Sequence, residues 1–241
     1  MRILLIQYRT DASAEHEYRC VTTHGRLDET SIHRVNPVLQ PGTLRTVRIA
    51  DYDAVVFGGS GEFSAATPGP IAGALDEARF VLDDVLATDH PFFGMCFGHQ
   101  VLARHLGARV VTDPNESQVG SHPVRVTVAG QADRLFADVP AEFIAQHGHK
   151  DAVIDEPAGA IHLAEGYKNR MGAYRIGQHV YATQFHPELT KADLVHRLTL
   201  YPEYLKGRTL EEASAEFRDS HEAVKVLRNF VDGIRPRPMA A

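Results

Sequence analysis

A short apolar run that ends in a cysteine constrains this chain more than any other segment. Residues 92–95 are apolar, Cys96 follows, and a helical pattern then runs over residues 98–106 up to Gly107. Glycines stand two residues before and two residues after the cysteine. A strand, a sharp turn and a helix in this order lift the side chain at the turn above the edge of a sheet, while the glycines let strand and helix approach closely. The segment therefore predicts a strand–elbow–helix unit.

The residues before the elbow repeat the alternation of strand and helix. Short apolar runs at 3–6, 31–35 and 53–57 read as strands. Apolar residues recur at helical spacing over 70–86, before the elbow strand begins. Strands that alternate with helices require right-handed crossovers and a parallel sheet. We expect an α/β fold with a mostly parallel central sheet flanked by helices.

The second half of the chain has a different pattern. Short strand-like runs separated by turn residues follow residue 110, and we expect several to extend the sheet or to form a small antiparallel β layer. From residue 191 the chain reads as helical, with Thr209 and Glu212 spaced as a capping box. We therefore expect a domain at 1–190 and a C-terminal helical extension at 191–241, packed on the domain or on a partner subunit.

Composition excludes several classes of protein. Lys and Arg number 25 against 31 Asp and Glu, which gives a net charge of −6 and argues against a nucleic-acid binder. No apolar run is long enough for a membrane span. Cys20 and Cys96 are the two cysteines, too few for a disulfide framework and typical of a reducing compartment. We expect a cytoplasmic protein without nucleic-acid or membrane partners.

Cys96 is the candidate nucleophile. At the N-terminus of a helix, a thiolate is stabilised by the helix dipole. The backbone N–H of Phe97 would point toward an oxyanion formed when the sulfur attacks a carbonyl. An arbitrary buried cysteine more often packs as a small hydrophobic residue, but the flanking glycines favour the catalytic interpretation here.

A cysteine nucleophile needs a base, and the base needs a group that orients it. His186 and Glu188 flank a proline where the strand-like run 180–185 ends. Side chains two apart at the end of a strand can project to the same side, so Glu188 can hold the imidazole of His186 in its reactive tautomer.

Taken together, these residues resemble the class I glutamine amidotransferases, a family with a Cys-His-Glu triad. The family's G-x-C-x-G-x-Q elbow is matched by Gly94, Cys96, Gly98 and Gln100, and its H-P-E motif by residues 186–188. A glycine pair at 58–59, a Gln-Val-Gly run at 118–120 and a His-x-Asp-x-Val stretch at 149–153 also stand where the family has them. The resemblance covers roughly residues 1–190 and is closest to stand-alone proteins like the amidotransferase domain of GMP synthetase.

The resemblance implies a flavodoxin-like fold and a set of functional residues. Cys96 would attack the δ-carbonyl of glutamine, His186 would transfer protons, and Glu188 would orient His186. Backbone N–H groups of Gly59 and Phe97 would form the oxyanion hole. The substrate's amino-acid end would be held by Gln100, Gln118, Val119 and Gly120, and His149 would line the pocket.

Two motifs have alternative interpretations. His147 and His149 lie two apart and could be metal ligands, but no third ligand at a suitable spacing accompanies them, so a structural or substrate-lining pair is favoured. The glycine-rich run at 58–61 lacks the Lys-Ser/Thr of a phosphate loop. We expect no metal and no cofactor.

Three functions remain open on these residues. The first is a glutaminase that releases ammonia for a separate synthetase, since the chain has no synthetase motif of its own. The second is a stand-alone γ-glutamyl hydrolase or peptidase that cleaves a γ-glutamyl amide or peptide. The third is a non-catalytic binding module, which the intact Cys96 and His186 disfavour. The apolar stripe of the C-terminal tail could also serve a homodimer.

Overall fold

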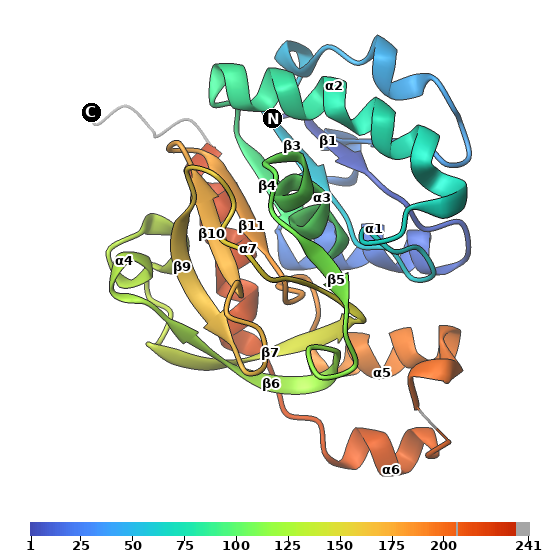
Figure 1. Cartoon of the computed structure of the whole chain (residues 1–241). Helices are drawn as coiled ribbons and strands as arrows, with labels where there is room; N and C mark the ends of the chain where they lie inside the picture. Colours follow the sequence, from blue (N-terminus) through green and yellow to red (C-terminus); the bar gives the residue numbers. More distant parts are fainter. Residues whose placement is uncertain (206, 235–241) are drawn as a thin grey trace.

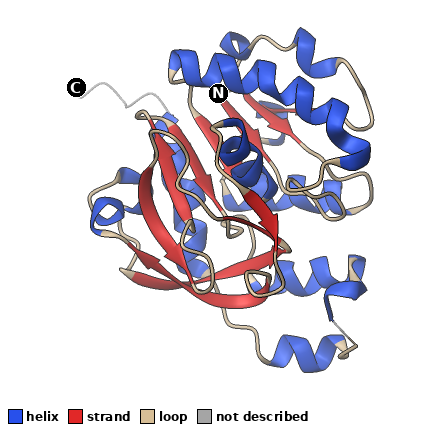
Figure 2. Ribbon diagram, in the orientation of Figure 1, coloured by secondary structure: helices blue, strands red, loops and turns tan. Residues whose placement is uncertain are grey.

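A computed structural model gives the fold of the chain and describes residues 1–205 and 207–234 (Figure 1). Nine strands form one mixed sheet in the order β2-β1-β3-β4-β11-β10-β9-β6-β7, with helices on both faces (Figure 2). The strands are β1 (Ile3–Ile6), β2 (Ile32–Val35), β3 (Ala54–Phe57), β4 (Phe92–Met95), β6 (Gln118–Val126), β7 (Glu142–His149), β9 (Ile161–Gly166), β10 (Ala173–Ile176) and β11 (Val180–Thr183).

The first half of the sheet is parallel. β1 pairs in parallel with β2 and β3, β3 with β4, and β4 with β11. β10, β9, β6 and β7 then add antiparallel strands. A separate two-stranded antiparallel sheet joins β5 (Val110–Thr112) to β8 (Asp151–Val153). These observations confirm the expected α/β class, including the small antiparallel layer.

Consecutive side chains of each central strand enter different cores, because strand side chains alternate between the two faces of a sheet. In β1, Leu4 and Ile6 pack with α2 (Ala72–Thr88) and α3 (Phe97–His105), whereas Ile3 and Leu5 pack on the opposite face. This burial on both faces explains why the central strands are continuous apolar runs rather than alternating ones.

The opposite face is covered by α1 (Ser13–His24) and α7 (His221–Ile234). Phe230 of α7 lies against Phe93 of the elbow strand, with ring centroids 4.9 Å apart. Complete burial of a side chain of this size stabilises a fold by about 1.5–3 kcal/mol. The C-terminal helix is therefore part of the core beneath the elbow.

Between β11 and α7 the chain forms α5 (Lys191–Leu200), the 3-10 helix η6 (Pro202–Leu205) and α6 (Leu210–Ala215). The capping box predicted at Thr209 and Glu212 is confirmed at the start of α6. A third apolar cluster joins Leu194 and Leu198 of α5 to Ala213 and Phe217. The division of the chain at residue 190, like the homodimer, stays a prediction.

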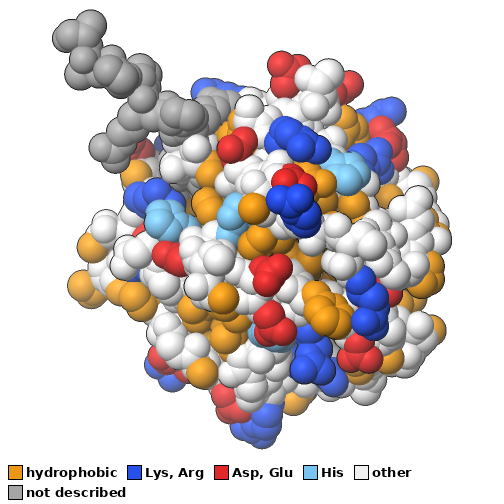
Figure 3. All heavy atoms as spheres, turned by 90° about the horizontal axis from the view of Figure 1, so that it is seen from above, with side chains coloured by type: hydrophobic (Ala, Val, Ile, Leu, Met, Phe, Trp, Pro, Cys, Tyr) orange, Lys and Arg blue, Asp and Glu red, His pale blue; other side chains and the backbone are white. Residues whose placement is uncertain are grey.

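No helix among the described residues is long and apolar enough to cross a membrane. On the face seen in Figure 3, Lys and Arg side chains are interspersed with Asp and Glu.

Candidate active site

Cys96 occupies a sharp bend between β4 and α3. Its φ of 49° and ψ of −93° are unusual for a residue other than glycine, and such strain is typical of functional turns. The backbone N–H of Cys96 donates to the carbonyl of Thr183 in β11 at 2.8 Å, which ties the bend to the neighbouring strand. The predicted elbow is therefore present.

The flanking glycines are required by close packing. A Cβ at Gly94 would lie 2.8 Å from the backbone carbon of Gly98, and a Cβ at Gly98 would lie 2.5 Å from the carbonyl oxygen of Phe57. Real Cβ atoms do not approach backbone this closely. The helix can therefore begin directly above the sheet only with glycine at both positions.

His186 lies just beyond β11 and is held by its backbone and its ring. Its N–H donates to the carbonyl of Gln146 in β7 at 2.9 Å. Its Nδ1 is 2.7 Å from Oε1 of Glu188, so Nε2 is the nitrogen left to face the sulfur. The His186 ring also interacts electrostatically with the side chain of Cys96. His186 and Glu188 therefore form a hydrogen-bonded pair beside the nucleophile.

Electrostatics favours the ionised forms of His186 and Glu188. Burial alone lowers the pKa of His186, but the charges of Glu188 and Cys96 and the hydrogen bonds to both raise it to about 9. Burial alone raises the pKa of Glu188, but the charge and hydrogen bond of His186, with Arg197 nearby, lower it to about 2. An imidazolium at neutral pH is what stabilises a neighbouring thiolate.

Cys96 opens onto a cavity of about 180 Å³, here called the nucleophile cavity. Gln100 and His149, both predicted to line the substrate site, are among its walls. The amide nitrogen of Gln100 already donates to the carbonyl of Asp151 at 2.8 Å and to Oε1 of Gln184 at 3.1 Å. The carbonyl oxygen of Gln100 is therefore the group that can accept a hydrogen bond from a substrate.

Asp151 fixes one wall of the nucleophile cavity. Its carboxylate accepts hydrogen bonds from the hydroxyls of Ser64 and Thr112 and from the backbone N–H groups of Ala65 and Ala66. The loop that follows the glycine pair is thereby attached to the second, smaller sheet. This explains why an aspartate is needed at the start of β8.

The two predicted oxyanion donors differ in availability. The N–H of Phe97 is the first of α3 and has no acceptor among the described residues. The N–H of Gly59 instead donates to Oε1 of Glu17 at 2.8 Å. The N–H of Gly59 is therefore occupied. Its expected role in the oxyanion hole requires that its hydrogen bond to Glu17 breaks.

The predicted substrate-binding run at 118–120 lies in β6, which pairs with β7, and Gln118 is directly opposite His149. Gln118 lines a separate cavity rather than the nucleophile cavity, and Val119 lines the small space beside His186. Gly120 has a φ of 111°, and a Cβ there would lie 3.0 Å from the ring of Phe217. Gln118 is thus not brought together with Gln100 around Cys96.

Several residues at this site were not anticipated from the sequence. Arg9 and Glu17 form a buried ion pair of 3.0 Å behind Gly59. Tyr204 of η6 lines the nucleophile cavity, and its hydroxyl donates to the carbonyl of Gly61 at 3.1 Å. Polar residues directly after the first buried strand were the only sequence signal for Arg9, whereas nothing local indicates Tyr204.

The histidine pair at 147 and 149 lies in β7 with ring centroids 5.7 Å apart. Burial is the main cause that lowers the pKa of both, and that of His149 falls to about 4. Nδ1 of His149 faces the carbonyl of Asp151 at 2.9 Å. Both rings are therefore neutral, and His149 is fixed in place as part of the cavity wall.

Three other potential ligands, His16, Cys20 and Asp193, bring their donor atoms within 4.8 Å of one another in the part of the chain that the structure describes. Nε of Arg197 donates to Nδ1 of His16 at 2.9 Å, so the proton of the neutral ring sits on Nε2. A metal would need Nε2 free of its proton. The cluster is therefore better explained as an internal hydrogen-bond network.

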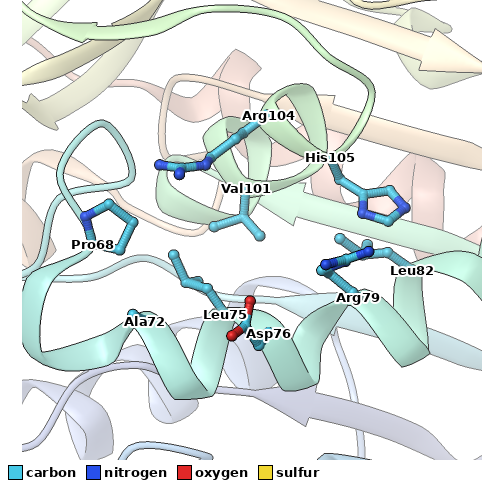
Figure 4. Close-up of a pocket in the computed structure, with 9 residues that line it drawn as sticks. All are labelled: Pro68, Ala72, Leu75, Asp76, Arg79, Leu82, Val101, Arg104 and His105. Carbon is cyan, nitrogen blue, oxygen red and sulfur yellow. The ribbon is translucent and has the colours of Figure 1, made fainter.

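A larger groove of about 380 Å³ lies between α2 and α3 (Figure 4). Leu75 and Val101 form its apolar part, and Arg79 and Arg104 extend along it. None of the triad residues lines this groove. This groove therefore lies apart from the catalytic triad.

Fold and site together define a class of protein: an α/β hydrolytic enzyme with a cysteine nucleophile on an elbow and a His-Glu pair beside it. A model of the family "Glutamine amidotransferase class-I" matches residues 34–198. The chain therefore belongs to the class I glutamine amidotransferases, which are cysteine-dependent amidohydrolases.

Individual relatives agree with this assignment. The glutamine-hydrolysing GMP synthase subunit of Sulfurisphaera tokodaii is 31% identical over 142 residues, which cover 58% of this chain and 70% of the relative. The corresponding GMP synthase subunit of Methanococcus aeolicus is 31% identical over 120 residues, covering 49% and 62%. A glutamine amidotransferase structure from Thermotoga maritima superposes with a TM-score of 0.73 at 20% identity, covering 97% of both chains, and supports the fold.

Proposed function

We propose that this chain hydrolyses the side-chain amide of glutamine through a γ-glutamyl thioester on Cys96. The observation that carries the proposal is the hydrogen-bonded pair of His186 and Glu188 beside Cys96 at a strained elbow. The sulfur attacks the δ-carbonyl, the imidazolium donates its proton to the leaving nitrogen, and water then releases glutamate.

Groups around the sulfur suit this substrate. The N–H of Phe97 is free to stabilise the oxyanion. The carbonyl oxygen of Gln100 and the wall that contains His149 are assigned to the amino-acid end of glutamine. These residue roles belong to the proposal. We also propose that the protein acts in the cytoplasm, where Cys96 would stay reduced.

We further propose that the ammonia is delivered to a separate synthetase. The relatives from Sulfurisphaera and Methanococcus favour this arrangement, since their names describe one subunit of a synthase. The second candidate, a γ-glutamyl hydrolase or peptidase, is favoured by a different observation: a small cavity lies beside His186, and a larger one of about 230 Å³ shares part of its wall.

The experiment is a measurement of glutamate and ammonia release from glutamine by the purified chain, with Cys96→Ser as the control. Release that depends on Cys96 supports the proposal, and an increase on addition of a cognate synthetase supports ammonia transfer. Equal release by the wild type and Cys96→Ser would refute the thioester route.

A further inference from the structure

The cavity of about 230 Å³, here called the α6 cavity, lies apart from the nucleophile cavity. Residues of β6, α5, η6 and α6 contribute to its wall. Neither Cys96 nor His186 lines it. Among the described residues, Tyr204 is the one that lines both the α6 cavity and the nucleophile cavity. The α6 cavity is therefore a separate space that shares one wall residue with the candidate active site.

The buried wall of the α6 cavity contains an unpaired amide. Gln118 lines the cavity and is 2% exposed, yet neither the nitrogen nor the oxygen of its side-chain amide has a hydrogen-bond partner among the described residues. A buried amide left unpaired is costly, and such groups normally have partners. A ligand with a hydroxyl group would supply this amide with both a donor and an acceptor.

Apolar side chains make up much of the remaining buried wall. Leu198 of α5, Ala213 of α6 and Phe217 all line the cavity, are buried and belong to one apolar cluster. Burial of apolar ligand surface against them favours binding. The volume is below the roughly 300–1,000 Å³ that is typical of ligand pockets. A suitable occupant is therefore small and has an apolar body.

The charged groups of the α6 cavity lie at its exposed side. Lys168 and Arg208 are exposed, and no Asp or Glu is among the described residues of the wall. Arg208 pairs with Glu216 at 2.9 Å. Lys168 donates to the carbonyl of Ser117 at 3.3 Å and forms no ion pair with a carboxylate in the described part of the chain. His122 adds no charge, because burial lowers the pKa of its ring. One positive charge is therefore left without a counter-charge, which matches a single carboxylate.

We propose that the α6 cavity binds a small monocarboxylate that has an apolar body and a hydroxyl group at the end away from the carboxylate. The carboxylate lies against Lys168, the apolar body packs on Phe217, and the hydroxyl group bonds to the amide of Gln118. The ligand is bound without chemical change, since neither Cys96 nor His186 lines the cavity. This binding site does not depend on the substrate that Cys96 attacks.

Tyr204 gives such a ligand an effect on the candidate active site, and this step rests on the proposed function. The hydroxyl of Tyr204 donates to the carbonyl of Gly61 at 3.1 Å, and Nζ of Lys150 lies 5.2 Å from the centre of its ring. Gly61 and Lys150 both line the nucleophile cavity. A ligand packed against Tyr204 from the α6 cavity holds this part of the wall in place, and a pre-formed wall favours the binding of glutamine. By linkage, each ligand then strengthens the binding of the other.

The test measures the binding of three aromatic probes to the wild-type chain by calorimetry. The probe para-hydroxybenzoate has all the features of the ligand, benzoate lacks the hydroxyl group, and para-hydroxybenzamide carries a neutral amide in place of the carboxylate. We expect para-hydroxybenzoate to bind roughly tenfold more tightly than para-hydroxybenzamide, because a hydrogen bond to a charged group can contribute that much. It should bind about fivefold more tightly than benzoate, because it alone pairs the amide of Gln118. Equal affinity for all three probes, or no binding of any, would overturn the site.

Matched variants locate the binding site. Lys168→Gln should bring the affinities for para-hydroxybenzoate and para-hydroxybenzamide close together, whereas Lys225→Gln, which removes a cation from α7, should leave their ratio unchanged. Gln118→Leu should abolish the preference for para-hydroxybenzoate over benzoate. Because this change removes an unpaired buried amide, it should not lower the melting temperature, and thermal denaturation checks that the variant is folded. Retention of both preferences in folded Lys168→Gln and Gln118→Leu would overturn the assignment to the α6 cavity.

A titration of the full-length Cys96→Ala variant with glutamine tests the link through Tyr204. Saturating para-hydroxybenzoate should lower the dissociation constant of glutamine by about fivefold, as in a modest allosteric coupling. An unchanged or higher dissociation constant would overturn the link and leave the binding site in place. Absence of Cys96-dependent glutamine hydrolysis in the wild type, with the probe still bound, would refute the proposed function and the link that rests on it, but not the α6 cavity as a binding site.

Discussion

The buried carboxylate of Glu17 accepts a 2.8 Å hydrogen bond from the backbone N–H of Gly59, on the turn that faces the catalytic histidine. The same carboxylate pairs with Arg9 at 3.0 Å, and both side chains are almost fully buried. Arg9 in turn donates to the hydroxyl of Tyr201, just before η6. A buried ion pair thus connects the turn beside the nucleophile to the segment that covers it.

We predict that Glu17→Gln destabilises the fold by about 3 kcal/mol, because it leaves the buried guanidinium of Arg9 without its counter-charge. The amide retains an oxygen that can accept from Gly59. Urea denaturation of Glu17→Gln, Arg9→Met and the double variant gives the coupling between the two side chains. Purely additive effects would contradict the ion pair as the source of the stability.

We predict that Gly98→Ala destabilises the elbow, because its Cβ would lie 2.5 Å from the carbonyl oxygen of Phe57. Overpacking of this kind typically costs about 1–3 kcal/mol. Gly73→Ala in α2 is the matched control, because its Cβ would meet nothing within 4 Å and alanine favours a helix. Thermal denaturation should show a lower melting temperature for Gly98→Ala and an unchanged or higher one for Gly73→Ala.

We predict that Glu188→Gln moves the alkaline limit of activity to lower pH. Glu188 is the main group that raises the pKa of His186 to about 9, so its neutral replacement should lower that pKa. Proton donation to the leaving nitrogen would then be lost at a lower pH. A profile of kcat/KM against pH checks this, and an alkaline limb in the same place in both proteins would contradict the assignment.

The same pair makes stability depend on pH. Because the pKa of His186 is raised from 6.5 to about 9, its contribution is complete below pH 6.5 and is lost as the pH rises through 9. Because the pKa of Glu188 is lowered from 4.5 to about 2, its contribution is complete above pH 4.5 and is lost as the pH falls toward 2. Denaturation at several pH values should show both losses, and in His186→Gln the loss near pH 9 should be reduced.

The elbow and the His-Glu pair could be predicted because their geometry is local. Glycines two residues either side of Cys96 specify the bend, and residues 186 and 188 are close enough in sequence to face each other. Glu17 and Gly59 are 42 residues apart, and Tyr204 and Gly61 are 143 apart. No local pattern reports such contacts, so the occupied N–H of Gly59 and the covering role of Tyr204 emerge only from the fold.

Gln118 illustrates the same limit. Its place in β6, opposite His149, is consistent with a position near the substrate. Whether it faces Cys96 or a different cavity depends on how η6 and α6 lie over that strand, and they reach it from about 90 residues later in the chain. The two short strands at 110–112 and 151–153 could not be recognised from the sequence either, because they pair only with each other.

The most direct test of the central claim is to trap the acyl-enzyme. The chain is mixed with glutamine, quenched in acid and digested, and the peptides that contain Cys96 and Cys20 are examined by mass spectrometry. We predict a γ-glutamyl adduct on Cys96 alone, since Cys20 is buried away from the nucleophile cavity and burial raises the pKa of its thiol. Glutamine turnover that persists in Cys96→Ser, with no adduct on Cys96 in the wild type, would contradict the thioester mechanism.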